Sequence, residues 1–466
     1  MKNSFFYDLK ISFIWKVIGL AISFGIQIFI ARVIGLENFG VWNTAVSWMQ
    51  IVLIVSLGGN IKSILRNASV NKEAFKQFIF VIIQTTITYI ILFTSFGFAL
   101  HSSSFPISTE LLTALIIAFF YGLFKMISML ETSMLQAVQK NYLSIFTTRI
   151  ALPVANAVVI GGLFLIFGNN IGILASYPVA ELIAVLLFLY FILKNYSQEK
   201  WSWEPRISFN FHFWINDITK SLVPFINIAI ISFLLSEDDI GGYSASYKIG
   251  EFLMFFTSIF VSFSPVIVRY IQDKRWEDLQ TAYLAINKLL LIVVFPFFLF
   301  LLVFSNDILS IFGQGFSEYS IVLQILIVGV YIDAVTGPIG EMLNMSKNEA
   351  IEKNINVSAT VLNIILLLIL SSYYGVIGAA MSFSLSRVLA NSSKLFFTNR
   401  KLKIKTLSPS HIKIFFLQLA LIIPFGFIYS PISKIGMFML VLLLLFVIIR
   451  GLKWLSLQEL KTIKNI

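Results

Sequence analysis

Charged side chains occur inside the apolar stretches of this 466-residue sequence, where they are the residues best suited to do chemistry. The set comprises Lys16, Lys125, Glu131, Arg149, Glu181, Asp217, Lys220, Lys248, Glu251, Lys288, Asp333, Glu341, Arg387 and Lys394. An ionisable residue at membrane depth is costly and usually faces a partner or a water-filled cavity. A purely structural bundle has little use for so many, so we expect the set to line a polar cavity.

The basic and acidic members suggest different roles. Lysines and arginines can attract an anionic group of a substrate, and the planar guanidinium of arginine can bind it in a bidentate way. Carboxylates can exchange a proton or ligate a sodium ion. Asp217 with Lys220, and Lys248 with Glu251, are three residues apart and share a helix face. Each is either a local ion pair or a switchable pair that lines the cavity, and we give these interpretations equal weight.

The elements that hold these charges are predicted to be transmembrane helices. Of the chain, 58% is hydrophobic and 12% is charged, against about 25% charged in soluble domains. The apolar residues form blocks of the length that spans a bilayer, about 20 residues. We predict an all-α polytopic membrane protein with about fourteen such helices. They lie near 11–33, 40–60, 77–99, 111–135, 142–167, 171–193, 213–235, 243–268, 284–304, 319–343, 353–374, 377–398, 412–429 and 433–450.

The distribution of charge between loops orients these helices. With the N-terminus in the cytoplasm, most of the 34 basic residues fall in cytoplasmic segments, as basic residues of membrane proteins do. The opposite loops hold Glu37, Glu110, Glu237, Asp238, Asp239, Asp307 and Glu318. We therefore place both termini in the cytoplasm, and the net charge of +11 implies no nucleic-acid partner. The absence of cysteine and the wide separation of the three histidines predict no metal site, and we expect no cofactor beyond a coupling proton or sodium ion.

The sequence repeats itself weakly. The segment 35–42 (GLENFGVW) and the segment 236–243 (SEDDIGGY) are both acidic turns followed by glycine and an aromatic residue. We predict two six-helix bundles, 1–200 and 201–400, with two further helices and a cytoplasmic tail in 401–466. Six helices is an even number, so the copies run in parallel. Such repeats are typical of alternating-access transporters with a substrate site between the halves, although channels also contain repeats.

The segment 30–42 (IARVIGLENFGVW) resembles the A-R-x-L-G-x-x-x-F-G signature of Wzx-type polysaccharide flippases. These belong to the multidrug/oligosaccharidyl-lipid/polysaccharide (MOP) exporter superfamily, so the resemblance implies a MOP/MATE-like fold in a bacterial inner membrane. It implies a substrate as well: an O-antigen or similar oligosaccharide repeat unit on undecaprenyl pyrophosphate. Polysaccharide polymerase and chain-length machinery are the expected partners, beside membrane lipid. Most close relatives have twelve helices, whereas lipid II flippases of the same superfamily have fourteen.

The resemblance gives the intramembrane charges specific candidate roles. The candidates for the pyrophosphate are Lys16, Lys125, Arg149, Lys220, Lys248 and Arg387. The candidates for ion coupling are Asp333, Glu251, Asp217 and Glu181. Aromatic side chains that could stack on sugars are Trp42, Trp48, Tyr247 and Tyr331, although packing is the favoured interpretation for them.

Other functions stay open. The first is a cation-coupled multidrug or small-molecule exporter of the same superfamily, and the second is a lipid II-type flippase. A membrane enzyme acting on the same glycan is disfavoured, because the external loops are short and hold no convincing catalytic set. The chain has no phosphate-binding glycine loop, so we do not expect it to hydrolyse ATP.

Overall fold

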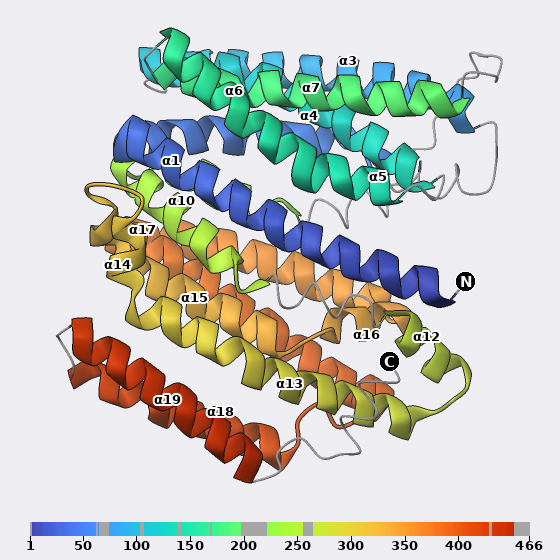
Figure 1. The fold of residues 1–466 in the computed structure, drawn as a ribbon, viewed down its shortest axis with the longest axis vertical. Coiled ribbons are helices and arrows are strands. Elements are labelled where there is room, and N and C mark those ends of the chain that lie inside the picture. Colours follow the sequence, from blue (N-terminus) through green and yellow to red (C-terminus); the bar gives the residue numbers. More distant parts are fainter. Residues whose placement is uncertain are drawn as a thin grey trace. The chain divides into compact units, whose positions relative to one another are not determined.

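The computed structural model describes residues 2–61, 64, 74–102, 107–137, 141–167, 170–196, 221–254, 264–427 and 431–451. All regular secondary structure in these ranges is helical (Figure 1). Contacts divide the chain into two compact units, Met1–Gly241 and Gly242–Ile466. Each unit positions its own set of intramembrane charges and is described by itself.

The first unit is a bundle of long apolar helices. They are α1 (Lys2–Leu57), α3 (Ala74–Ser102), α4 (Thr109–Ala137), α5 (Asn141–Phe146), α6 (Leu152–Phe167), α7 (Asn170–Tyr196) and α9 (Val223–Ile231). A π-helical turn, Thr147–Ala151, joins α5 to α6. Helix α4 packs against α7 and α1, and α6 packs against α7, so α4 and α7 form the centre of this unit. Helix α10 (Glu237–Glu251) begins in the first unit and continues into the second.

The second unit is built around α13, α15 and α17. Its helices are α12 (Ser264–Gln272), α13 (Trp276–Val303), α14 (Ser305–Ser310), α15 (Ser320–Val335), α16 (Ile339–Met345), α17 (Glu349–Leu402), α18 (Pro409–Ile422) and α19 (Pro431–Gly451). Helix α15 packs against both α17 and α13, while α18 and α19 pack on α13.

Two of the longest helices are each broken at a glycine. Gly35 in α1 has φ 80° and ψ 171°, and Gly375 in α17 has φ 57° and ψ −138°. These backbone conformations are costly for any residue with a side chain larger than the hydrogen atom of glycine. Each helix therefore consists of two arms and contains two of the predicted spans, 11–33 with 40–60 in α1 and 353–374 with 377–398 in α17.

The prediction of an all-α polytopic membrane protein is confirmed. Within the described residues, eight helices are long and apolar enough to cross a membrane. Helices α1 and α17 each count once among these eight, although each contains two of the predicted spans. The number fourteen stays a prediction, because 213–235 and 243–268 fall partly outside the described ranges. The predicted boundary at 200/201 also lies outside them, within 197–220, so the division into 1–200, 201–400 and 401–466 stays a prediction as well.

Helix α18 is fixed to the rest of the second unit by buried hydrogen bonds. Gln418 of α18 donates from Nε2 to the carbonyl of Leu291 (2.7 Å) and accepts from the Tyr331 hydroxyl (2.6 Å). Nearer the start of α18, the Nε2 of His411 lies 3.0 Å from the carbonyl of Leu284. Gln418 and His411 are both 2% exposed. Buried polar groups are costly unless paired, so these contacts favour one docked position for α18 on α13.

Glycines of the two repeated turns meet within the first unit. A Cβ atom on Gly40 would lie 1.8 Å from the carbonyl oxygen of Glu237. One on Gly241 would lie 2.4 Å from the carbonyl oxygen of Leu36. Phe39, between these contacts, is fully buried. Gly40 of the signature segment and Gly241 of the second turn therefore act in packing, because they let the start of α10 approach the backbone of α1.

Candidate functional site

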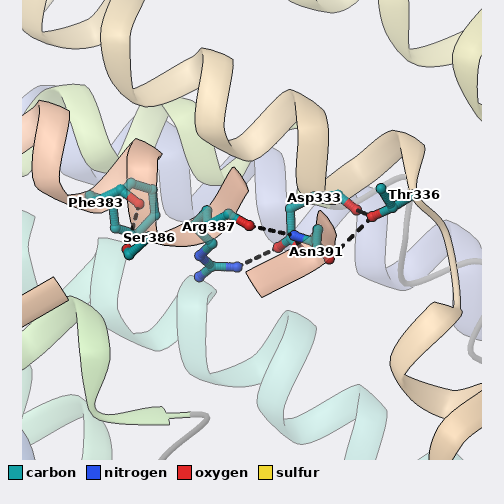
Figure 2. A network of polar contacts seen from close by, with 6 residues as sticks. All are labelled: Asp333, Thr336, Phe383, Ser386, Arg387 and Asn391. Atoms are coloured by element: carbon teal, nitrogen blue, oxygen red, sulfur yellow. Dashed lines mark hydrogen bonds and ion pairs between the residues drawn. The ribbon is translucent and has the colours of Figure 1, made fainter. Parts of the chain in front are cut away.

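The charge network of the second unit joins α15 to α17 (Figure 2). Arg387 of α17 forms an ion pair with Asp333 of α15. Asn391, one turn beyond Arg387, donates from Nδ2 to Asp333 Oδ1 (2.9 Å) and accepts at Oδ1 from Thr336 (3.2 Å). Both carboxylate oxygens of Asp333 thus have a donor. The Arg387 and Asp333 side chains are 23% and 20% exposed, so the pair is partly accessible.

Small residues allow α15 and α17 to hold this network. A Cβ atom on Gly329 would lie 2.7 Å from the Cα of Ser384, so the two helix backbones approach closely there. The Ser384 hydroxyl donates to the carbonyl of Ile325 across the same contact (2.7 Å). Close approach through small residues and interhelical hydrogen bonds is typical of membrane helices.

Helix α10 adds a second group of charges to the same unit. The Tyr247 hydroxyl forms a hydrogen bond with Glu251, which also interacts electrostatically with Lys248 and Arg387. The Tyr247 ring packs edge-on against Phe383 at 5.4 Å, and the Arg387 guanidinium lies 5.0 Å from the Phe383 ring centroid. Two acids and two bases are therefore grouped, and their formal charges balance.

The first unit contains a corresponding pair between α4 and α7. Lys125 donates from Nζ to the Tyr121 hydroxyl (3.1 Å), lies 5.0 Å from the centroid of that ring, and interacts electrostatically with Glu181. Ser128 donates to Glu181 Oε2 (3.0 Å). Glu181 is 5% exposed, and its carboxylate is stabilised by the nearby lysine charge and by the serine hydrogen bond.

A pocket of about 200 Å³ opens beside this pair. Its polar and aromatic lining comes from α1, α4, the π-helical turn, α6 and α7. Those lining residues are Ser23, Gln27, Tyr121, Thr148, Asn156, Tyr177 and Glu181. Gln27 donates to the Tyr177 hydroxyl (2.8 Å), and the Tyr121 and Tyr177 rings lie 5.3 Å apart with Trp42 packed against both.

Sequence reasoning missed the aromatic partners of the charges, although a signal for them exists. Tyr121 precedes Lys125 by four residues and Tyr177 precedes Glu181 by four. In the second unit the same spacing relates Tyr247 to Glu251 and Phe383 to Arg387. Side chains at i and i+4 lie on one helix face, so an aromatic residue one turn before a charge is placed where it can contact that charge.

The other predicted site residues are not brought into these groups. Arg149 lies in the π-helical turn with an exposed side chain. Lys16 belongs to α1, but its side chain lies outside what the structure describes. Asp217 and Lys220 fall in 197–220, also outside the described residues. The roles assigned to all ten candidates stay predictions.

The four aromatic residues proposed for sugar stacking are packing residues. Trp42 is 2%, Trp48 1%, Tyr331 4% and Tyr247 6% exposed. Trp48 stacks on Phe233 (5.6 Å), and Tyr331 stacks in the second unit on an α13 phenylalanine. The favoured interpretation of these side chains is thus supported. Among the described residues, no group of three or more histidines or acids could hold a metal ion.

Acidic residues surround the start of α10. Partial burial raises the pKa of the Glu237 carboxyl above its usual 4.5, and the negative charges of Glu37, Glu110 and Asp238 raise it further. The folded protein therefore holds the Glu237 proton more tightly than the unfolded chain. This contributes stability below about pH 4.5 that is lost as the pH rises through the folded-state pKa.

We expect Glu237→Gln to stabilise the protein at pH 7.5, because it removes repulsion among these acids. The gain should be below about 1 kcal/mol, since the side chain is partly exposed, and should disappear near pH 4. Melting temperatures in detergent at both pH values measure it, and high salt should shrink the gain by screening. An equal gain at both pH values would show that packing, not charge, is responsible.

Solved structures show which fold this chain has. The chain aligns over 95% of its length with 99% of "Lipid II flippase MurJ, inward closed conformation", with TM-score 0.75 and 16% sequence identity. It also aligns over 82% of its length with 98% of an inward-facing multidrug resistance MATE family transporter of the MOP superfamily, with TM-score 0.63 and 14% identity. The chain therefore has the fold that these two transporters share.

Sequence comparison then names the family. The profile described as "Polysaccharide biosynthesis protein" matches residues 9–269, more than half of the chain, and the chain belongs to this family. A MatE profile matches residues 215–369. The resemblance based on the segment 30–42 is confirmed.

Two curated relatives match over part of their length. "Probable low-salt glycan biosynthesis flippase Agl15" of Haloferax volcanii is 26% identical over 174 residues, 37% of each chain. Lipopolysaccharide biosynthesis protein WzxC of Escherichia coli K12 is 26% identical over 226 residues, 46% of this chain and 44% of WzxC. The matched region thus spans less than half the length of either relative.

Proposed function

We propose that this protein is a flippase that moves a lipid-linked oligosaccharide from the cytoplasmic to the outer leaflet of a membrane. The observation that carries the proposal is the family match over residues 9–269. The names of both curated relatives and the MurJ-like fold agree with it. On this proposal the protein is a transporter and not an enzyme.

The substrate we propose is an oligosaccharide repeat unit of a surface polysaccharide, such as O-antigen, on undecaprenyl pyrophosphate. A glycan and a pyrophosphate must cross hydrocarbon while the lipid tail stays in the bilayer. The charge groups of both units support this, because they provide polar surface inside otherwise apolar helices. Translocation would proceed by alternating access, with a proton or sodium ion bound at one of the four acidic candidates, Asp333, Glu251, Asp217 or Glu181.

We place the protein in the inner membrane of a bacterium with both termini in the cytoplasm, from the charge distribution of the loops. The polysaccharide polymerase would then receive the flipped repeat unit outside. A second candidate function is export of a small molecule coupled to a cation. The MatE match over residues 215–369 and the MATE-like fold favour it.

Deletion of the gene should separate these functions. We expect unpolymerised, carrier-linked repeat units to accumulate, because they are made inside and polymerised outside. Mass analysis of the lipid extract and of surface glycan measures this, and re-expression of the intact gene should reverse it. Normal surface glycan together with increased drug sensitivity would contradict the proposal and favour the exporter.

A further inference from the structure

The pocket between α4, α6 and α7 of the first unit differs from a phosphate site in its charge. Among the described residues that line it, only Glu181 carries a charge, and that carboxylate interacts with Lys125 and accepts a hydrogen bond from Ser128. Lys125 itself donates to the Tyr121 hydroxyl and lies over the Tyr121 ring. Because the Lys125 charge is partly offset by the nearby Glu181 carboxylate, it offers little net attraction to a pyrophosphate, whose charge must be neutralised when it leaves water.

The uncharged lining suits a neutral, hydroxyl-rich ligand. Asn156 and Gln27 present amides, and Ser23 presents a hydroxyl; such groups can both donate and accept hydrogen bonds. The Thr148 hydroxyl donates to the carbonyl of Ser144 (2.7 Å) and offers its oxygen as an acceptor. A sugar ring carries hydroxyls of the same dual character. Its C–H faces are apolar and pack well on aromatic rings, and Tyr121 and Tyr177 line this pocket.

The pocket is also held in one shape. Gln27 of α1 donates to the Tyr177 hydroxyl (2.8 Å), and the Ser176 hydroxyl lies 3.3 Å from Asn156 Oδ1, which ties α7 to α6. Trp42 packs on Tyr177 with ring centroids 5.0 Å apart. Polar groups fixed in advance lose little entropy when a ligand binds.

The size of the pocket limits what it can hold. Its volume of about 200 Å³ is below the roughly 300–1,000 Å³ typical of drug-sized sites. A single sugar ring is a suitable occupant, whereas a whole repeat unit or a polyprenyl tail is too large. We propose that this pocket binds one neutral sugar ring of the glycan, and that Lys125 and Glu181 position its lining instead of binding the pyrophosphate.

This inference rests on the proposed function, and its test separates the two. Purified protein is titrated with two probes and read by native mass spectrometry. One probe is the carrier-linked repeat unit extracted from the deletion strain, and the other is undecaprenyl pyrophosphate without a glycan. Asn156→Leu removes an amide from the pocket and fills it with apolar atoms.

We expect Asn156→Leu to bind the carrier-linked repeat unit about tenfold more weakly, a loss of about 1.4 kcal/mol, and to bind undecaprenyl pyrophosphate as the unchanged protein does. Ser23→Leu changes an exposed residue of the lining and should weaken binding of the carrier-linked repeat unit in the same way. It replaces Asn156→Leu in the test if that variant does not fold. Thr94→Val on α3 is the matched control, because its hydroxyl bonds only to its own helix at Ile90 and Ile91, and it should bind both probes normally.

Three results would overturn the inference while leaving the proposed function intact. The pocket variants bind both probes normally, or they lose both probes equally. The third result concerns Glu181→Gln. If this variant transports without depending on protons or sodium, yet still binds the carrier-linked repeat unit more tightly than undecaprenyl pyrophosphate, the pocket is a cation site. If the unchanged protein binds neither probe, the proposed function itself fails and the inference falls with it.

Discussion

Arg387→Ala and Asp333→Ala should each abolish surface glycan while the protein still accumulates in the membrane. Either substitution leaves the other charge without its partner among apolar helices. Removing one partner of a buried pair costs about 3–5 kcal/mol. Because these side chains are 23% and 20% exposed, we expect the lower end of that range. Transport should fall to background, because the network between α15 and α17 then has an uncompensated charge.

A double variant separates transport from folding. Arg387→Met combined with Asp333→Leu removes both charges and should recover most of the lost melting temperature, because apolar side chains often replace a buried pair without cost. It should still fail to restore surface glycan. Complementation by both single variants at normal levels would contradict a role of this pair in transport.

A surface pair of the same chemistry provides the matched control. Arg275 and Asp278 form a 2.7 Å ion pair whose side chains are 50% and 51% exposed. Exposed pairs contribute roughly 0–1 kcal/mol. Arg275→Ala should therefore change neither the melting temperature nor the amount of surface glycan measurably.

Gly40→Ala should be the most destabilising single methyl addition in the first unit. The added Cβ would lie 1.8 Å from the Glu237 carbonyl oxygen and 3.0 Å from the Gly241 nitrogen. These are backbone atoms of the start of α10, so they cannot move aside by a rotamer change. Overpacking costs typically about 1–3 kcal/mol, and we expect the upper end. The melting temperature in detergent and the recovery of folded protein measure the effect.

Two further glycines of α1 distinguish a steric clash from backbone strain. Gly25 has nothing within 4 Å of an added Cβ, so Gly25→Ala should leave stability unchanged or slightly higher. Gly35 also has open space around it, but its φ of 80° is unfavourable for alanine. Gly35→Ala should therefore destabilise by about 1–2 kcal/mol through strain alone. Equal stability of Gly40→Ala and Gly25→Ala would contradict the packing role of the signature segment.

The membrane-spanning segments and their helical structure were predictable because both depend on local composition. In lipid, a run of about 20 apolar residues can satisfy its backbone hydrogen bonds by forming a helix. Helices α3, α4, α7 and α13 accordingly agree with the predicted spans. The signature segment 30–42 identified the family for a related reason: Gly35 and Gly40 are required by backbone conformation and close packing. Such requirements leave a readable pattern in the sequence.

The pairing of charges was not predictable. The Arg387–Asp333 ion pair joins residues 54 positions apart, and Lys125 of α4 interacts electrostatically with Glu181 of α7. Nothing local distinguishes these pairings from others, because the rotation of each helix about its axis is set by packing. The Asp217–Lys220 pair, predicted from spacing, lies outside the described residues and stays a prediction.

The sequence by itself determined that charges occur inside apolar helices and how often they do so, since both follow from composition and periodicity. Only the tertiary structure decided which partner each of those charges has. It pairs Arg387 with Asp333 and brings Lys125 into electrostatic interaction with Glu181, so two cations expected to attract a pyrophosphate each have an acidic partner in the same unit. It also places Tyr121, Tyr177, Gln27 and Asn156 around one pocket. The physical reason is that a charge in an apolar helix is stable only beside its partner, and the packing of helices distant in sequence supplies that partner.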